Sequence, residues 1–415
     1  MLDNTPRSNP SENNIVVVGA GPAGLCAAIA LAKSDVPVTL VAALHRPAGN
    51  RPDTRTAALF NPAIALLSNL GAWEYCKQQS AELRAIRLID DTGDLIRAPE
   101  VLFNASEIGA QVFGYNIPQE PLVHALREIA KQTPTLQIFE SAGVRELNPG
   151  TDDVELRLAE GETLRAKLAV AADGRRSITR QAAGITTETR DCGQTAVTCI
   201  FAHTRDHAGV SSEFHRRAGP MTVVPMPGRH SSLVWVERPS VAQRLYDMDE
   251  PGFARTLEQN LQGLLGTISE VGPRAIFPLS YMHADRMARN RIALVGESGH
   301  AMPPIGAQGL NLSLRDVAHL AELVAESSGR GEDVGSQSLL RRYDSLRTPD
   351  ARTRGFAVNT LNQALLSEFP PVQLGRAVGM HLIKAIGPLR HQLMKLGMAP
   401  TTPLPPLMHF RGTSS

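Results

Sequence analysis

The stretch Ile15 to Ala32, IVVVGAGPAGLCAAIALA, places a short apolar strand directly before a glycine-rich turn and an alanine-rich helix. This order is typical of a dinucleotide-binding βαβ unit, in which a pyrophosphate lies at the helix N-terminus. Gly19 would form the tight turn, Gly21 would let the backbone approach the phosphates, and Gly24 would let helix and strand pack closely. The alternatives are a buried hydrophobic hairpin and a membrane span, but the glycines and proline within the run favour a soluble core.

The composition of the whole chain narrows the class of protein. Its 415 residues suffice for two closely packed domains. The formal net charge is +1, so nothing points to nucleic acid as a partner. The cysteines have no CxxC or zinc spacing, so we expect reduced thiols, no metal site and a cytoplasmic location. Residues 1–14 are polar without an apolar core, which predicts a disordered leader rather than a signal peptide.

The second strand of the dinucleotide unit is predicted over Val36 to Ala42 (VPVTLVA). In such units this strand usually ends in an acidic residue that binds the ribose hydroxyls. Here Ala42 and Ala43 take that place. We therefore expect either that backbone groups and a nearby side chain such as Arg46 replace the acid, or that the nucleotide is held more weakly.

From residue 44 to residue 171, the sequence alternates between helical and extended patterns. Residues 44–60 are predicted to form a loop rich in Pro and Arg, which is either a wall of the cofactor site or an ordinary solvated loop. Asn61-Pro62 is predicted to open a helix, with Asn61 as its cap. We expect a hairpin over residues 83–103 and a helix over Pro118–Gln132. We expect a strand over Leu136–Glu140 and a β-meander over Val144–Ala171.

Two further strand–loop–helix elements follow. In LAVAADGRRSITR, residues 168 to 180, an apolar strand runs into Asp173-Gly174 and then a helix. Arg291 to Gly296 (RIALVG) is predicted to be a buried parallel strand, and a glycine-rich loop and a long helix to about Glu326 follow it. This loop would place another helix N-terminus on the same ligand. The β-rich pattern over 195–237 and the helical pattern over 240–268 indicate a second, sheet-based domain.

The C-terminal tail has a different composition. Residues 369–415 contain five Arg or Lys and no Asp or Glu, and apolar residues are dense among them. Such a segment suits a membrane surface or an apolar partner. We expect residues 369–411 to contact the inner face of a membrane or a biosynthetic complex. The alternative is a terminal helix that packs on the domain with its charges in water.

Four segments, in this order, resemble the class A flavoprotein monooxygenases, the family of para-hydroxybenzoate hydroxylase, and most of all its ubiquinone-biosynthesis branch. They are GAGPAG, DTRTAAL, ADGRRSITR and GESGHAMPPIGAQGLNLSLRD. The resemblance implies an α/β fold with a Rossmann-like FAD-binding domain, an inserted β-sheet substrate domain and a helical C-terminal region. The predicted boundaries are 15–80, 105–190 and 285–335 for the FAD-binding domain, 81–104 and 191–284 for the substrate domain, and 336–415 for the C-terminal region.

The resemblance also implies which residues contact the cofactor. Arg55 and Gln119 would lie on the flavin side, and Val144 would offer its backbone to the adenine. Glu297 stands where the family usually has Asp on the ribityl chain, so a carboxylate is kept with one more methylene. Pro304 would lie against the isoalloxazine. The full set implied is Gly19, Ala20, Gly21, Pro22, Ala23, Gly24, Ala42, Arg46, Arg55, Gln119, Val144, Asp173, Gly174, Glu297, Pro304, Gly309, Leu310 and Asn311.

The implied reaction is the hydroxylation of an aromatic ring. NADPH or NADH reduces FAD, O2 adds to give a flavin hydroperoxide, and its distal oxygen passes to the ring. The DTRTAAL loop, the helix beginning near Asn61 and Tyr343-x3-Arg347 favour a hydroxylation in ubiquinone biosynthesis, which would act on a polyprenylated phenol. The alternatives are a hydroxylase of a small soluble phenol and a non-catalytic scaffold in a biosynthetic complex. No general base is identified, and His300 is expected to be structural. Because the flavin carries the chemistry, no catalytic side chain is assigned, and Arg55 and Pro304 are the nearest candidates.

Overall fold

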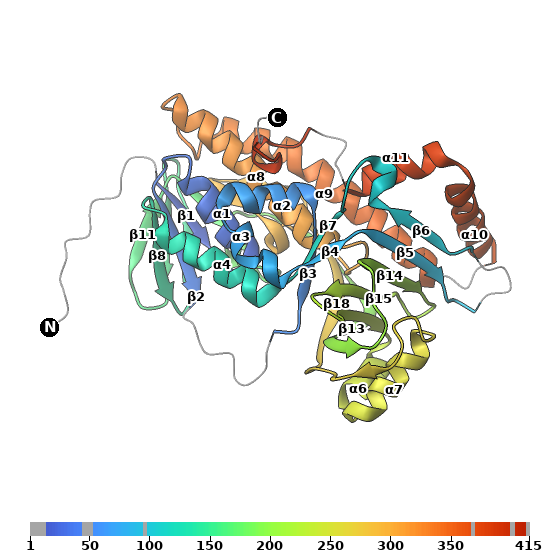
Figure 1. Cartoon of the computed structure of the whole chain (residues 1–415). Coiled ribbons are helices and arrows are strands. Elements are labelled where there is room, and N and C mark those ends of the chain that lie inside the picture. Colours follow the sequence, from blue (N-terminus) through green and yellow to red (C-terminus); the bar gives the residue numbers. More distant parts are fainter. Residues whose placement is uncertain (1–13, 44–52, 94–97, 367–369, 399–402, 412–415) are drawn as a thin grey trace.

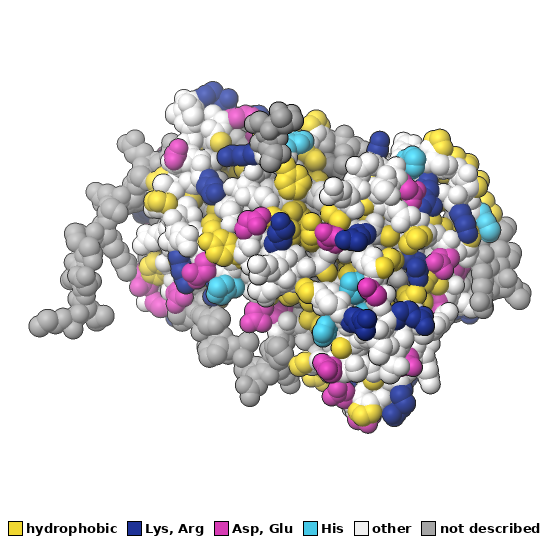
Figure 2. All heavy atoms as spheres, viewed as in Figure 1, with side chains coloured by type: hydrophobic (Ala, Val, Ile, Leu, Met, Phe, Trp, Pro, Cys, Tyr) yellow, Lys and Arg dark blue, Asp and Glu magenta, His cyan; other side chains and the backbone are white. Residues whose placement is uncertain are grey.

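The computed structural model describes residues 14–43, 53–93, 98–366, 370–398 and 403–411. Within these residues, two large sheets organise the chain, one of six strands and one of nine. In Figure 1 the six-stranded sheet lies at the left with α1 (Pro22–Ala32), and the nine-stranded sheet lies at the lower right with α6 (Pro239–Asp247) and α7 (Glu250–Asn260). Figure 2 shows charges of both signs interspersed over this face, in keeping with the small net charge.

The six-stranded sheet is the predicted dinucleotide-binding frame. Its order is β19-β20-β12-β1-β2-β8, and all neighbouring strands are parallel except β19 and β20. The central strands are apolar throughout because both faces of the sheet are covered. The carboxyl ends of β1, β12 and β20 therefore lie at one edge. The strands are β1 Ile15–Val18, β2 Val38–Ala43, β8 Leu136–Ser141, β12 Leu168–Ala171, β19 Ala288–Arg289 and β20 Ile292–Leu294.

The nine-stranded sheet has the order β21-β18-β13-β16-β15-β14-β5-β6, with β17 paired to β13. One of its faces packs on α6 and α7 through buried side chains such as Phe201, Trp235 and Phe253. The predicted hairpin joins this sheet through a parallel pairing of β5 with β14. The strands are β5 Ala85–Asp90, β6 Val101–Asn104, β13 Thr187–His203, β14 Val210–His215, β15 Met221–Met226, β16 His230–Glu237, β17 Ile268–Ser269, β18 Ala275–Ala284 and β21 His300–Ala301.

Two expectations near residue 60 are wrong. Residues 56–60 form a strand, β3 (Thr56–Phe60), rather than the end of a loop, because they pair with β7 (Gly114–Pro118), whose other edge pairs with β4 (Ala81–Leu83). The helix α2 (Asn61–Leu70) begins where expected, but its N-cap is Phe60. The amide of Asn61 donates instead to the carbonyl of Val112, at 2.8 Å.

The remaining elements follow the predicted pattern closely. The meander is an antiparallel sheet of β9 (Val144–Pro149), β10 (Val154–Leu158) and β11 (Thr163–Ala166), and the last predicted strand, β12, belongs to the parallel sheet. None of the helices that the structure describes has the length and apolar character needed to cross a membrane. The other helices are α3 Trp73–Cys76, α4 Gln119–Gln132, α5 Ile178–Ala182, α8 Gln308–Gly329, α9 Gln337–Leu366, α10 Pro370–Ala385 and α11 Gly387–Met398.

Candidate active site

Three loops meet at the carboxyl edge of the parallel sheet, one after each of β1, β12 and β20. The backbone N–H of Ala172 donates to the carbonyl of Val18 at 2.8 Å, and that of Val295 donates to Ala171 at 2.9 Å. The hydroxyl of Ser298 also donates to the carbonyl of Ala171, at 2.6 Å. These hydrogen bonds tie the three loops together, so that segments far apart in the sequence form one site.

The glycines of the first loop differ in what surrounds them. Gly19 has a φ of +109°, and a Cβ there would lie 2.3 Å from the carbonyl oxygen of Ala172. A Cβ at Gly24 would lie 1.9 Å from the carbonyl oxygen of Gly19. At Gly21, by contrast, a Cβ would meet no atom within 4 Å. Gly19 and Gly24 are thus required by packing and backbone conformation, whereas Gly21 keeps a space open in front of α1.

The edge has the features that an anionic dinucleotide needs. Gly21 is the N-cap of α1 and Ala307 is the N-cap of α8, and neither cap offers a side-chain hydrogen bond to the first turn. Added Cβ atoms at Gly174, Gly306 and Gly309 would also meet open space. Uncapped helix N-termini present free N–H groups and favour negative charge. The backbone present here therefore fits the pyrophosphate of a bound dinucleotide.

Asp173 adds a carboxylate oxygen that no described group satisfies. Its Oδ2 accepts hydrogen bonds from the backbone N–H of Thr179 at 3.2 Å and from the Thr179 hydroxyl at 2.9 Å. Its Oδ1 is buried and has no hydrogen-bond partner among the residues that the structure describes. A buried polar atom without a partner is costly, so a bound hydroxyl or amide donor at this oxygen would stabilise the site.

Arg55 and Gln119, which are far apart in the sequence, lie together. Arg55 Nη2 forms an ion pair with Asp53 Oδ2 at 2.7 Å, and Gln119 Nε2 donates to the same oxygen at 3.1 Å. The hydrogen bond to Asp53 raises the pKa of Arg55, to which the charge of Glu297 also contributes. Burial alone would raise the pKa of Asp53, but the hydrogen bonds and charge of Arg55 outweigh it and lower that pKa.

The other residues expected to hold the cofactor are placed as follows. Glu297 is exposed and forms an ion pair with Arg175 at 3.1 Å. Pro304 is exposed in the loop before α8. Ala42 is buried near the end of β2, and the strand register places Glu140 of β8 beside it. Sequence reasoning missed this carboxylate because only the pairing of β2 with β8 brings it near. Val144 opens β9 just after β8, and Arg46 lies outside the described residues.

Asn311 holds the N-terminus of α8 in place. Its side-chain amide donates to the carbonyls of Ala58 at 2.9 Å and Ala307 at 2.7 Å. Its Oδ1 accepts from the backbone N–H of Phe60 at 2.9 Å. The side chain thus bridges β3 and α8, so any contact that Asn311 makes with a cofactor would come from its backbone.

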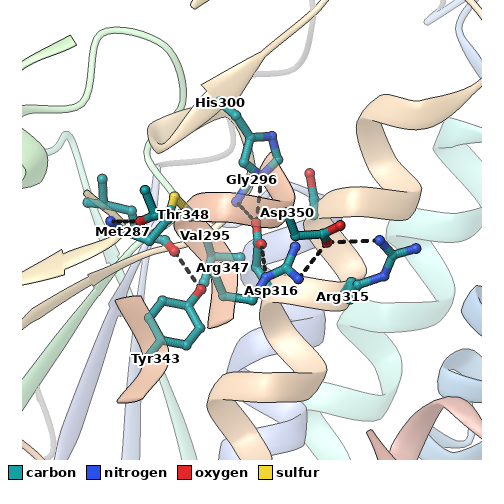
Figure 3. Close-up of polar contacts among 12 residues, drawn as sticks. Met287, Val295, Gly296, His300, Arg315, Asp316, Tyr343, Arg347, Thr348 and Asp350 are labelled. Carbon is teal, nitrogen blue, oxygen red and sulfur yellow. Dashed lines mark hydrogen bonds and ion pairs between the residues drawn. The ribbon is translucent and has the colours of Figure 1, made fainter. Parts of the chain in front are cut away.

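A buried carboxylate, Asp316, fixes the loop after β20. Its Oδ2 accepts from the backbone N–H of Gly296 at 3.0 Å and from His300 Nε2 at 2.7 Å. Its Oδ1 accepts from Arg347 Nε at 2.8 Å. Figure 3 shows His300 and Arg347 both directed at Asp316, and Tyr343 donating its hydroxyl to the chain near Val295, through the carbonyl of Leu294. His300 therefore has a structural partner, and Asp316 positions the loop.

The same network joins α8 to α9. Asp350 accepts from Arg347 Nη1 at 2.7 Å and from Arg315 Nη1 at 2.9 Å. Burial would raise the pKa of Asp350, but the charges of Arg347 and Arg315 outweigh it and lower that pKa strongly. Burial lowers the pKa of Arg315 to about 10. Because these charges are almost fully buried, loss of Asp350 would remove the ion pair that the structure gives Arg315 in the interior.

His319 of α8 makes stability depend on pH. It is 5% exposed, and burial, with the charge of Arg347, lowers its pKa from 6.5 to about 4. Between these values the unfolded chain binds a proton that the folded chain does not, so stability is lost as the pH falls from 6.5 toward 4. This loss of folding free energy amounts to about 3 kcal/mol.

In urea unfolding across this pH range, His319→Leu should lose the part of the pH dependence of stability that comes from His319. The control His124→Gln, at an exposed position, should keep it. An unchanged slope in His319→Leu would contradict the assignment.

An apolar cluster lies beside the N-cap of α8. Half-buried Ala307 packs against it, and its buried members come from β3, β4, β15, α11 and the segments between them. These buried members are Phe60, Leu83, Ala105, Phe113, Val224 and Met394. The proposed flavin end of the site is therefore bordered by apolar side chains of the three-stranded sheet β3-β7-β4, of the nine-stranded sheet and of α11.

The chain resembles known proteins over nearly its whole length. A family model described as an FAD binding domain matches residues 12–354. The chain is 33% identical to the ubiquinone hydroxylase UbiL of Rhodospirillum rubrum, covering 95% of this chain and 91% of that protein. It is 27% identical to the 3-demethoxyubiquinol 3-hydroxylase of Escherichia coli, covering 94% and 99%. The solved structure of p-nitrophenol 4-monooxygenase PnpA from Pseudomonas putida aligns with a TM-score of 0.75 at 21% identity, covering 93% and 98%.

These findings confirm the family, the fold class and FAD as the cofactor. The family model spans all three strand–loop–helix elements and the whole nine-stranded sheet. The site itself fits the cofactor through its two uncapped helix N-termini and the unsatisfied oxygen of Asp173. The chain belongs to the FAD binding domain family, as an FAD-dependent aromatic monooxygenase with a para-hydroxybenzoate hydroxylase-like fold.

Proposed function

We propose that this protein hydroxylates the aromatic ring of a polyprenylated phenol in ubiquinone biosynthesis, with O2 and a nicotinamide donor as co-substrates. The observation that carries the proposal is the meeting of three loops and two uncapped helix N-termini at one edge of the sheet, beside an apolar cluster. The names of the two full-length relatives, both ubiquinone-pathway hydroxylases, support the choice of substrate.

The proposed contacts assign each part of the site to one part of FAD. The N-terminus of α1 and the space at Gly21 would hold the pyrophosphate, and Asp173 would accept a hydrogen bond from the cofactor. Arg55, Gln119 and Glu297 would flank the flavin side, and the backbone from Pro304 to Asn311 would line the ring. When bound, FAD supplies the redox chemistry, which is hydride acceptance from the donor and insertion of one oxygen atom of O2 into the ring.

The chain's own part is to orient the reactants and to control charge and water. The uncapped N-terminus of α8 favours negative charge and would stabilise it on a group placed against this helix. The apolar cluster beside Ala307 would exclude water and accept an apolar substrate. We propose the domain division given above, with 81–104 and 191–284 forming the substrate side, because β5, β6 and β13–β18 share one sheet.

A polyprenylated substrate also implies where in the cell the protein works. Such a molecule resides in a lipid bilayer, because its isoprenoid chain is apolar. We propose that the protein works at the cytoplasmic face of the membrane, with residues 369–411 as its contact to the bilayer or to a biosynthetic complex.

The function is tested by deletion of the gene and mass spectrometry of lipid extracts. We expect a prenylated phenol that lacks one ring hydroxyl to accumulate and the quinone pool to fall. The wild-type gene should restore the pool, and a Gly21→Val gene should not. An unchanged quinone pool, with accumulation of a small soluble phenol instead, would contradict the proposed substrate.

A further inference from the structure

The last two long helices carry a row of exposed apolar side chains. Val378, Leu382 and Ile386 recur at every fourth position and therefore lie on one side of the helical segment, and Leu389 follows in α11. Each of the four side chains is between 36% and 46% exposed. In the described part of the chain, four of the nine exposed large hydrophobic side chains lie in this row, which we call the α10–α11 face. Such a concentration marks an interaction surface rather than scattered exposure.

The position of α10 leaves this face partly exposed among the residues that the structure describes. α10 packs against α9 and α11 and contributes little to either large sheet. Figure 1 shows α10 at one end of the molecule, remote from β11. Figure 2 shows hydrophobic, basic and His side chains at that end, with some acidic side chains among them. The face is therefore available to a large, flat partner.

The charged residues of α10 and α11 are all basic. Lys384 and Lys395 are exposed on α10 and α11, and residues 369–415 contain no Asp or Glu. Glu107, an acidic residue that contacts α11, forms an ion pair with Arg390 of this helix. Apolar side chains flanked by uncompensated Lys are the composition that binds an anionic bilayer surface, since each basic residue adds attraction to acidic headgroups.

The other side of α11 reaches the candidate active site. Met394 is buried in the apolar cluster with Phe60 and Val224. Arg390 donates to both carboxylate oxygens of Glu107 at 2.6 Å, and its guanidinium lies 4.8 Å from the centre of the Phe103 ring. One side of α11 thus packs in the apolar cluster beside α8, and another side contributes Leu389 to the α10–α11 face.

We propose that the α10–α11 face docks on an anionic lipid bilayer, so that α11 separates the bilayer from the apolar cluster of the active site. This placement deepens the proposed function and rests on it in one respect, because a polyprenylated phenol would have to pass from the bilayer to that cluster. The lipid-binding part of the proposal depends only on the exposed row of apolar side chains and on the basic charge.

The test is co-sedimentation of the purified, FAD-loaded full-length protein with lipid vesicles. We expect binding to phosphatidylcholine vesicles that contain phosphatidylglycerol, weaker binding to phosphatidylcholine alone, and release by added salt because screening weakens the attraction. The double variant Leu382→Glu, Ile386→Glu should lower the partition coefficient at least about tenfold, since two apolar contacts are lost and two negative charges gained. Tyr75→Glu, at an exposed hydrophobic position on α3, should bind as the wild type does.

FAD content and the melting curve check that each variant is folded. The proposal is overturned if the protein does not bind the phosphatidylglycerol vesicles, or if the double variant binds them equally well. It is also overturned if the double variant instead reduces the molecular mass in sedimentation velocity, because the face would then be an interface between copies of this chain. These results are independent of hydroxylation, which is measured with a detergent-solubilised substrate, so the docking surface and the proposed function can fail separately.

Discussion

Gly21→Val is expected to abolish FAD binding while the protein stays folded. Gly21 has an extended backbone (φ −73°, ψ 177°) that valine also adopts, and a Cβ there meets no atom within 4 Å. The isopropyl group would fill the space in front of α1 where we place the pyrophosphate. Losing two charge-assisted hydrogen bonds there lowers FAD affinity at least about 100-fold. The measurement is the ratio of flavin to protein absorbance, with circular dichroism to show the fold.

Gly24→Val is the matched control at the same loop. Its Cβ would lie 1.9 Å from the carbonyl oxygen of Gly19, so this variant should fail to fold or should unfold at a much lower temperature. Comparing the two variants distinguishes a glycine whose missing side chain leaves space for a ligand from a glycine whose missing side chain leaves space for the protein backbone. A folded Gly21→Val protein with a normal FAD content would show that the pyrophosphate does not lie in front of α1.

Asp316→Asn should destabilise the protein by about 3–5 kcal/mol, because it leaves the buried guanidinium of Arg347 short of negative charge. The side chain of Asp316 is fully buried and also holds the N–H of Gly296 and the ring of His300. Because these contacts fix the loop after β20, the variant should also lose FAD more readily. Urea unfolding and FAD titration at neutral pH measure the two effects.

Glu332→Gln is the control for Asp316→Asn. Glu332 pairs with Arg330 at 2.8 Å, but both side chains are about half exposed. Solvent screens such pairs, so we expect the urea unfolding curve of Glu332→Gln to lie close to that of the wild type. Equal small effects of Glu332→Gln and Asp316→Asn would contradict the positioning role of Asp316.

The frame around the site was predictable because it depends on local patterns. β1, β12 and β20 are buried on both sides, so each is an unbroken apolar run directly before a glycine, an Asp-Gly pair or a glycine-rich loop. The order of the segments then places the three loops at one edge. For the same reason, helices with a regular apolar period, such as α4, were found within a residue or two.

The features that were missed depend on contacts between distant parts of the chain. β3 resembles a loop by composition and becomes a strand because β7 pairs with it. Arg347 and Asp350 would usually be assigned to a solvated helix face, yet the packing of α9 against α8 buries the side chains of both almost completely. Glu140 comes beside Ala42 through strand register alone. No local pattern in the sequence reports such pairings, although the Tyr343-x3-Arg347 spacing did mark the region.

We propose that this chain holds FAD at the three-loop edge and hydroxylates an aromatic ring there with one oxygen atom of O2. The most direct measurement supplies the FAD-loaded protein with NADPH or NADH, a polyprenylated phenol in vesicles and isotopically heavy O2, and then analyses the product by mass spectrometry. We expect a ring-hydroxylated product that carries one heavy oxygen atom, and no such product from Gly21→Val. A hydroxylated product without the heavy atom, or none from the FAD-loaded wild type, would contradict it.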